Sequence, residues 1–211
     1  MKYGIIWDLD GTMWDSSEWV SIAWNEYCSA HGIERRFTPA DCRSYCGKTL
    51  EQIAQVVFPD ADEQWRNEVI VACCDAECIP LAEHGGRLFE GLETVLKKLH
   101  ERYHMSVVSN CGLGYIEAFY QGNRTKQYFD DEENAARTGM GKADNIRLVM
   151  ERNGIDRAVY IGDTLGDYQA AKQASVDFVF AAYGYGDAPD AKWRIDSLNE
   201  LPALIEQIFS E

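Results

Sequence analysis

The sequence predicts an α/β protein in which a doubly wound parallel sheet forms the core and an all-helical segment is inserted after the first strand. Two observations lead to this fold class. Short apolar runs at 3–7, 105–108, 158–161 and 176–180 are typical of strands buried on both faces of a parallel sheet. From about residue 85 onward these runs alternate with segments of helical periodicity, which is the pattern of a doubly wound sheet.

The helices of the predicted core follow from the spacing of their apolar residues. Apolar side chains recur every three or four positions in segments between the strands and in one segment after the last strand. In chain order these are Leu92, Val95, Leu96 and Leu99; Ile116, Phe119 and Tyr120; Ile146, Val149 and Met150; and Leu201, Leu204, Ile205 and Ile208. Asn153-Gly154 is a stop signal, and Pro202 is tolerated in the first turn of the last helix.

Residues 16–83 interrupt the alternation, because only helical signals occur there. The first strand therefore belongs with the later sheet. We expect a core domain of residues 1–15 and 84–211 and a helical domain of residues 16–83. Linkers near Ser16 and near residues 83–86 would act as hinges between them.

The helices of the insert have recognisable ends. One is expected from about Asp15 to Ala30, and another begins at Thr38-Pro39, with threonine as the cap and proline in the first turn. Thr49-Leu50-Glu51-Gln52 is a capping box that begins a further helix. A last, long helix follows the apolar stripe Trp65, Val69, Ala72, Cys73 and Ala76, and we expect Pro80 to terminate it.

Composition and charge exclude several classes of protein. The 211 residues are 46% hydrophobic and 26% charged, which is ordinary for a globular protein. The net charge of −15 would repel nucleic acid and an anionic membrane surface. The first apolar run ends at Asp8, too soon for a signal peptide, and no run approaches the roughly 18 apolar residues of a membrane span. We expect a cytoplasmic monomer or homodimer.

The seven cysteines cannot all pair with one another, because their number is odd. Cys42 with Cys46 and Cys74 with Cys78 have a spacing that zinc can use, so a structural zinc is one alternative. The same spacing places both thiols on one face of a helix. Reduced cysteines in the core are the favoured interpretation.

Polar residues gather where the predicted strands end, and in open α/β sheets ligands bind at the carboxyl ends of the strands. The first strand runs into Asp8-Leu9-Asp10-Gly11-Thr12, and the second into Ser109-Asn110. The strand at 158–161 is followed by Asp163-Thr164-Leu165-Gly166-Asp167. Lys142 stands at the start of the helix before that strand.

These residue types fit phosphoryl transfer. Three carboxylates that converge cannot all stay ionised without a cation, which implies a hard, oxygen-preferring ion such as Mg²⁺. A carboxylate at a strand tip can attack phosphorus and form an aspartyl-phosphate, and a second one two residues later can be the general acid and base. Lys142 and the Ser109 hydroxyl can hold the transferring oxygens. Gly11 lets the turn pass close beneath the ligand.

In this order the segments resemble the four motifs of the haloacid dehalogenase-like (HAD) hydrolases. The resemblance covers essentially the whole chain, because residues 16–83 stand where subfamily I members carry a helical (type C1) cap. It implies a Rossmann-like core with an inserted all-helical cap. Ala182-Tyr183-Gly184-Tyr185-Gly186 is similar to a run in phosphoglycolate phosphatase-like members. Cys111 departs from the small polar residue usual after the second motif, and its role is open.

The resemblance implies a role for each matching residue. Asp8 would be the nucleophile and Asp10 the general acid and base, with Lys142 as the third catalytic residue. Mg²⁺ would be held by the side chains of Asp8 and Asp163 and by the backbone carbonyl of Asp10. Asp167 would complete the metal site by orienting metal-bound water or Lys142. Phosphate would be bound by Gly11, Thr12, Ser109, Asn110 and Lys142.

The predicted function is that of a Mg²⁺-dependent phosphatase acting on a small phosphomonoester metabolite, phosphoglycolate or a similar ester, through an aspartyl-phosphate. Asp10 favours a phosphatase, since haloacid dehalogenases lack an acid there. A β-phosphoglucomutase-like phosphomutase and a non-catalytic phosphate-binding protein are the alternatives. Lys48 and Arg43 are candidates to face the substrate, whereas Trp14, Trp19 and Trp24 are expected to pack in the core or cap.

Overall fold

The computed structural model describes residues 1–211, and its main sheet has six parallel strands in the order β5-β4-β1-β6-β7-β8. The strands are β1 (Tyr3–Trp7), β4 (His104–Ser109), β5 (Asp131–Asn134), β6 (Arg157–Gly162), β7 (Asp177–Ala181) and β8 (Trp193–Ile195). The predicted α/β fold with a Rossmann-like doubly wound parallel sheet is confirmed.

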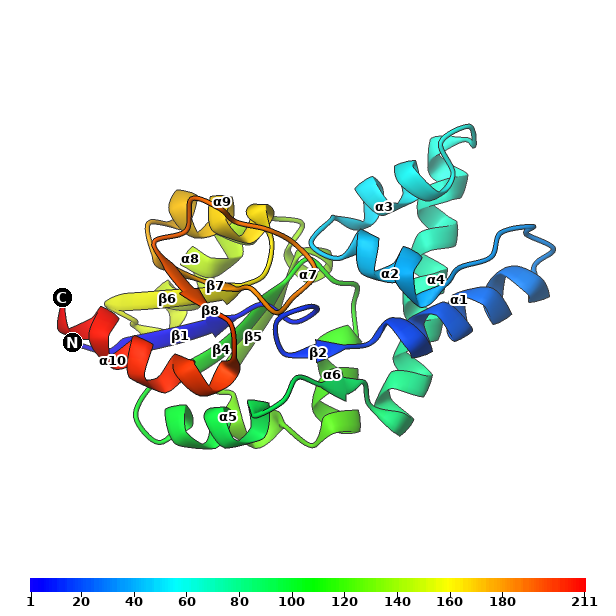
Figure 1. Cartoon of the computed structure of the whole chain (residues 1–211). Helices are drawn as coiled ribbons and strands as arrows, with labels where there is room; N and C mark the ends of the chain where they lie inside the picture. The colour runs from blue at the N-terminus through cyan, green and yellow to red at the C-terminus, as the bar shows by residue number, and fades with distance from the viewer.

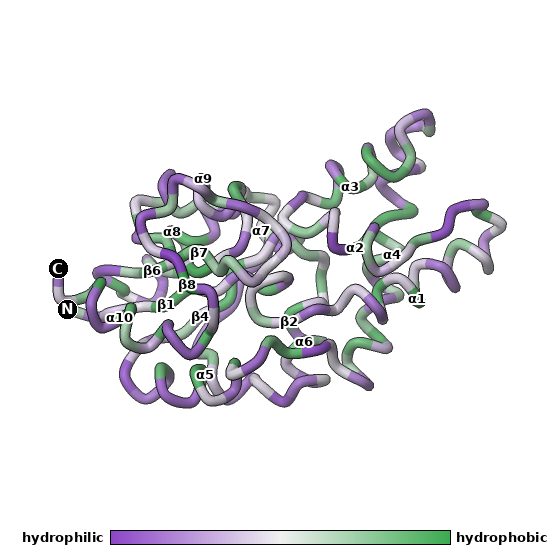
Figure 2. Tube along the Cα trace, viewed as in Figure 1, coloured by the Kyte–Doolittle hydropathy of each residue, from purple (hydrophilic) through white to green (hydrophobic).

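Helices cover both faces of the sheet (Figure 1). On one side lie α5 (Leu92–His100), α6 (Tyr115–Asn123) and α10 (Leu201–Ser210), and on the other α8 (Lys142–Asn153) and α9 (Leu165–Ala174). Residues of β1 alternate between the two layers, since Ile5 and Trp7 join one apolar cluster and Ile6 the other. Figure 2 shows the apolar strands enclosed by helices with polar outer faces.

The insert after β1 consists of four helices: α1 (Ser17–Ala30), α2 (Pro39–Tyr45), α3 (Leu50–Val57) and α4 (Glu63–His84). Capping boxes at Thr38 and Thr49 begin α2 and α3, as the sequence predicts. The chain enters and leaves through a small antiparallel pair, β2 (Trp14–Asp15) with β3 (Arg87–Leu88). The helices project beyond the carboxyl ends of the main strands, and both termini lie at the opposite end of the sheet (Figure 1).

The prediction that Pro80 ends the last helix of the insert is wrong. Helix α4 continues to His84 and is closed by Gly85 in a positive-φ conformation. The turn after Pro80 carries Leu81, which is fully buried. The backbone of Leu81 comes so close to α6 that a Cβ on Gly122 would lie 2.1 Å from its carbonyl oxygen. The free energy gained by packing this turn against α6 therefore outweighs the loss of the backbone hydrogen bond that proline cannot make.

Several short elements were not predicted from the sequence. Strand β5 reads Asp-Glu-Glu-Asn and forms one edge of the sheet, where Arg152 of α8 pairs with Asp131 and Glu133. Strand β8 forms the other edge. The remaining short elements are η1 (Lys126–Tyr128), α7 (Ala135–Thr138) and η2 (Leu198–Glu200).

All seven cysteines are free thiols. Four of them pack in the apolar core, namely Cys28, Cys42, Cys73 and Cys74. None belongs to a group of three or more potential metal-ligating side chains. The chain contains no helix with the length and apolar character of a membrane span.

Candidate active site

The predicted site residues from the strand ends meet at the carboxyl edge of the sheet. Asp8 directly follows β1, Ser109 is the last residue of β4, and Asp163 directly follows β6. Strand β1 lies between β4 and β6, so these three positions are neighbours. Lys142 joins them from the first turn of α8.

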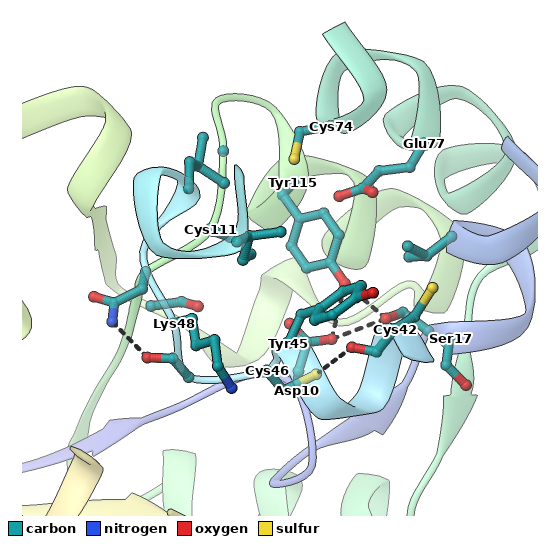
Figure 3. A pocket seen from close by; sticks show the side chains of 18 of the residues that line it. Asp10, Ser17, Cys42, Tyr45, Cys46, Lys48, Cys74, Glu77, Cys111 and Tyr115 are labelled. Carbon is teal, nitrogen blue, oxygen red and sulfur yellow. Dashed lines mark hydrogen bonds between the residues drawn. The ribbon is translucent and has the colours of Figure 1, made fainter. Parts of the chain in front are cut away.

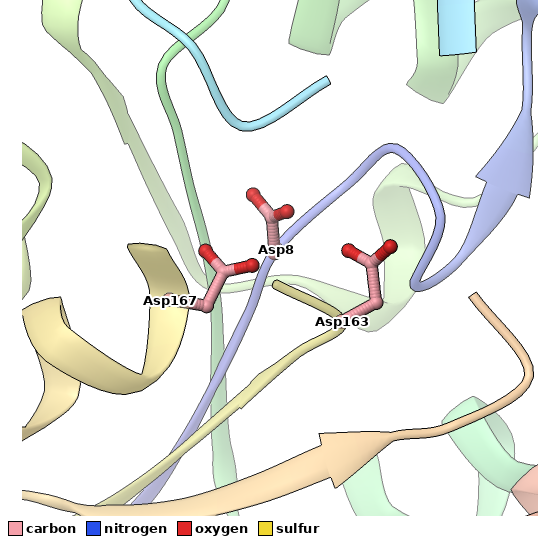
Figure 4. A group of neighbouring side chains, drawn as sticks. All are labelled: Asp8, Asp163 and Asp167. Carbon is pink, nitrogen blue, oxygen red and sulfur yellow. The ribbon is translucent and has the colours of Figure 1, made fainter. Parts of the chain in front are cut away.

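Three buried carboxylates form the centre of the site (Figure 4). Oxygen atoms of Asp8, Asp163 and Asp167 all lie within 4.8 Å of one another. Burial, together with the negative charge of Asp167, raises the pKa of Asp163 to about 7. The same two causes raise the pKa of Asp8 well above its ordinary value, although Lys142 opposes them. Lys142 alone therefore does not offset the negative charge of these three carboxylates.

Lys142 is the cation that the protein itself supplies. Its Nζ donates hydrogen bonds to Asp8 Oδ1 at 2.9 Å and to Asp167 Oδ1 at 2.6 Å. Burial alone would lower the pKa of Lys142, but the two carboxylates raise it well above its ordinary value. The side chain is therefore charged and fixed between its partners.

Local backbone features hold the other two carboxylates in place. Asp167 closes the capping box of α9, where its Oδ2 accepts hydrogen bonds from the backbone N–H (3.0 Å) and the hydroxyl (2.6 Å) of Thr164. Asp163 Oδ2 accepts from the backbone N–H of Tyr185 at 2.7 Å. A Cβ on Gly184 would lie 2.3 Å from the Cβ of Asp163. The glycine-rich run after β7 thus packs directly on the site.

Gly11 and Thr12 pack against Asp163, and neither lines the pocket described below. Gly11 has φ +77°, and a Cβ there would lie 2.2 Å from Asp163 Oδ2. Thr12 is fully buried, and its hydroxyl lies 3.4 Å from Asp163 Oδ1. In this arrangement both residues shape the position of Asp163.

Asp10 is not part of this group of three carboxylates, and its side chain accepts hydrogen bonds from two hydroxyls. The hydroxyls of Ser16 and Tyr115 lie 2.9 Å and 2.8 Å from Asp10 Oδ1, and 2.7 Å from each other. Burial raises the pKa of Asp10, and these hydrogen bonds act in the opposite direction. Ser16 and Tyr115 were not predicted from the sequence, where neither belongs to a motif.

A pocket opens above these residues, between the core and the helical insert (Figure 3). Its cavity volume is about 80 Å³. The core contributes Asp8, Asp10, Ser109 and Asn110 to its wall. Asn110 also reaches the insert, since its Nδ2 donates to the carbonyl of Gly47 at 3.0 Å.

The helical insert supplies the opposite wall. Lys48 lines the pocket, whereas Arg43 does not, because it is paired with Asp15 at 2.8 Å. Trp24 also lines the pocket. Trp14 is fully buried and Trp19 stacks on His84, so these two side chains pack against the protein as predicted.

Glu77 is a pocket residue that the sequence analysis missed. It lies in register with Cys73, Cys74 and Leu81 on the buried face of α4. A single acid in such an apolar stripe was the available signal.

Comparison with known proteins agrees with this geometry. The family profile of haloacid dehalogenase-like hydrolases matches residues 5–181. A phosphoglycolate phosphatase of Synechococcus elongatus is 24% identical over 98% of this chain and 99% of its own length. One of Rhodobacter capsulatus is 25% identical over 98% of each chain.

Solved structures show the same fold. A predicted phosphatase from Clostridium acetobutylicum superposes with a TM-score of 0.81 at 21% identity, covering 98% of this chain and 99% of its own. CbbY from Rhodobacter sphaeroides, solved in complex with phosphate, has a TM-score of 0.78 at 22% identity, covering 95% and 96%.

Fold and site together define a doubly wound α/β protein with an inserted helical domain and an aspartate-rich centre at the strand ends. The chain belongs to the haloacid dehalogenase-like hydrolase family. The two curated relatives, which it matches along nearly their full length, are phosphatases. The resemblance inferred from the four motifs, and the prediction of a phosphatase-type hydrolase, are confirmed.

Proposed function

We propose that this protein is a Mg²⁺-dependent phosphatase that hydrolyses a small phosphomonoester through an aspartyl-phosphate on Asp8. The observation that carries the proposal is the position of Asp8. It lines the pocket, has Lys142 on one carboxylate oxygen, and lies two residues from an acid held by two hydroxyls. Phosphoglycolate is one ester of this class, and both curated relatives bear its name.

The donor set fits a divalent cation. Asp8, Asp163 and Asp167 offer hard oxygen ligands within 4.8 Å of one another. The raised pKa values of Asp8 and Asp163 are consistent with a group in which one lysine does not offset the negative charge. We infer that Asp8 and Asp163 would hold Mg²⁺, together with the Asp10 backbone carbonyl, and that Asp167 would position Lys142 beside them. When bound, Mg²⁺ supplies positive charge to phosphoryl oxygens.

The first half of the reaction transfers the phosphoryl group to the protein. Lys142 occupies Asp8 Oδ1, so Oδ2 is the oxygen that attacks phosphorus. The new bond joins Oδ2 to phosphorus while the ester P–O bond breaks, and Asp10 gives its proton to the departing alcohol oxygen. The raised pKa of Asp10 favours the protonated form that this step requires.

The second half returns Asp8 to its starting state. Asp10, now ionised, takes a proton from water, and the water oxygen attacks phosphorus while the bond between Asp8 Oδ2 and phosphorus breaks, which releases inorganic phosphate and restores the Asp8 carboxylate. Lys142, beside Asp8, and the pocket residues Ser109 and Asn110 would hold phosphoryl oxygens in both steps. The helical insert covers the pocket and limits the entry of bulk water, as caps and lids do in other enzymes.

Phosphate release from small phosphate esters tests this function. We expect release with Mg²⁺, none with EDTA, and a loss of about 10⁴-fold in kcat/KM for Asp8→Asn. Asp144→Asn, a change of the same kind at an exposed position on α8, is the control and should act like the wild type. An active Asp8→Asn enzyme would contradict the mechanism. Transfer to a second sugar hydroxyl without phosphate release would favour the phosphomutase alternative.

We infer further that the protein works on a soluble metabolite in the cytoplasm, as a monomer or homodimer. Seven free thiols support a reducing compartment, and the charge of −15 argues against polyanionic partners. Light scattering of the purified protein would give its oligomeric state.

A further inference from the structure

Glu77 is a buried carboxylate at the cap end of the pocket. It lies on α4 and is 4% exposed. The Trp24 indole N–H donates to its Oε2, and the protein offers no other hydrogen bond to the carboxylate. Figure 3 shows the side chain directed into the pocket from the insert, opposite Asp10 and Tyr115 of the core. Oε1 is thus a hydrogen-bond acceptor without a partner in the protein, and it faces the pocket.

No cation of the protein balances this carboxylate. Glu77 takes part in none of the ion pairs of the chain, and burial raises its pKa well above the ordinary value. The one lysine from the insert that lines the pocket, Lys48, donates its Nζ to the carbonyl of Ser44 at 2.6 Å. Burying an acid without a partner is costly, so its position in a ligand pocket points to a counter-charge on the ligand.

The wall around Glu77 suits a short hydrocarbon chain. Aromatic side chains of Trp24, Tyr45 and Tyr115 line it, and their faces attract cations. The other residues at this end are mainly apolar or thiol-bearing: Val20, Cys42, Leu50, Ile53, Cys74 and Cys111. A sugar would leave many hydroxyls without partners here, and a carboxylate would face Glu77 with like charge.

The pocket is also small. Its cavity volume is about 80 Å³, well below the range usual for ligand pockets, so a short ester suits it better than a long one.

From these observations we propose that the preferred substrate is the phosphate ester of a short amino alcohol, whose ammonium group binds Glu77 Oε1. This inference rests on the proposed phosphatase function and specifies its substrate class. Glu77 would act as a specificity-determining residue, with the Trp24 N–H fixing the orientation of its carboxylate.

Four esters of similar length test the charge that the pocket prefers. They are phosphoethanolamine with an ammonium group, hydroxyethyl phosphate with a hydroxyl, propyl phosphate with a methyl, and phosphoglycolate with a carboxylate. We expect kcat/KM for phosphoethanolamine to exceed that of the two neutral esters about tenfold or more, the scale of a hydrogen bond between charged groups. Phosphoglycolate should be the poorest of the four.

Glu77→Gln removes the charge and keeps the size of the side chain. We expect the ratio of kcat/KM between phosphoethanolamine and propyl phosphate to fall about tenfold in this variant. Asp75→Asn is the matched control, because Asp75 is an exposed acid on the same helix. It should leave that ratio unchanged.

A binding measurement separates recognition from turnover. Aminopropylphosphonate carries a CH₂ in place of the ester oxygen and is not hydrolysed, and butylphosphonate is its neutral counterpart. Calorimetry should show tighter binding of the aminophosphonate to the wild type, and this advantage should disappear in Glu77→Gln.

The outcomes distinguish the two proposals. Hydrolysis of all four esters with no ammonium preference, or a preference that persists in Glu77→Gln, would overturn the amino-alcohol inference and leave the phosphatase intact. No Mg²⁺-dependent release from any ester, or from others of wider chemistry, would overturn the phosphatase and the inference that rests on it.

Discussion

The site has a core end, formed around Asp8 at the strand ends, and a cap end, formed around Glu77 of the insert. Both ends contain buried acids, but the groups that contact these acids differ. At the core end, Asp8 and Asp167 share the ammonium group of Lys142, and Asp163 accepts a backbone N–H. At the cap end, Glu77 has one indole N–H and no cation. At the core end the protein itself supplies a cation and a backbone donor to its acids, whereas the cap end depends on the substrate for a counter-charge.

We attribute the difference to the proposed roles of the two ends, which are catalysis at the core end and selectivity at the cap end. Catalysis requires groups held in fixed positions, because transition-state stabilisation depends on dipoles and charges that are already in place. Selectivity requires an interaction that only the right ligand can satisfy, since a buried acceptor left without a partner penalises the wrong one. Changes at the core end should therefore reduce turnover of every ester, and changes at the cap end should alter the choice among esters.

Lys142→Gln, a change at the core end, is expected to cause the largest loss of activity. It removes the cation between Asp8 and Asp167, so we expect kcat/KM to fall about 10³-fold for all four esters alike. Lys172→Gln, at an exposed position on α9, serves as the control and should retain full activity. A Lys142→Gln enzyme that lost activity toward only one ester would erase the distinction between the two ends.

Tyr115→Phe should have a smaller effect, on turnover more than on binding. The hydroxyl positions Asp10 from α6, so its loss is expected to lower kcat about tenfold while KM changes little. Tyr120→Phe is the matched control, because the Tyr120 hydroxyl on the same helix has no partner in the protein. Equal effects of the two substitutions on kcat would show that Tyr115 acts only through packing.

Besides its effect on the choice of ester, Glu77→Gln should produce a gain in stability, which is the smallest of the effects expected here. Burial raises the pKa of Glu77 in the folded protein, so protonation stabilises the fold. This stabilisation is complete below the unfolded pKa, near 4.5, and is lost as the pH rises through the folded value. In the absence of ligand we expect Glu77→Gln to raise the Tm at about pH 8 by on the order of 3 °C.

The pH dependence of that gain provides its check. Since the wild-type side chain takes up a proton as the pH falls, the difference in Tm between Glu77→Gln and wild type should shrink toward about pH 5. Scanning calorimetry at several pH values measures it. A difference that stays constant with pH would indicate that Glu77 is already neutral or well solvated in the fold.

The core end could be predicted from the sequence because its signals are local. Asp8, Ser109 and Asp163 each follow a short apolar run, and parallel strands place their carboxyl ends at one edge. Helix caps at Thr38, Thr49 and Thr164 depend on residues three positions away, which also lie within one window of sequence.

The cap end could not be predicted in this way. Whether Glu77 faces solvent or a pocket depends on how α4 packs against α1 and α6. The residues next to Glu77 in the sequence do not indicate that packing. Tyr115 and Ser16 likewise meet Asp10 from elements 105 and six positions away. Strand β5 is paired because of the strand beside it, although its own residues are acidic and polar.

The α/β core, the inserted helices and the group of aspartates with Lys142 at the strand ends can be predicted from the chain alone, since they depend on periodicity, caps and strand ends. Three features depend on long-range packing: α4 continues through Pro80, Thr12 packs against Asp163, and Glu77 lines the pocket. The cause is the same in each case. Burial against a distant element supplies free energy that overrides a local preference, and its partner lies far away in the chain.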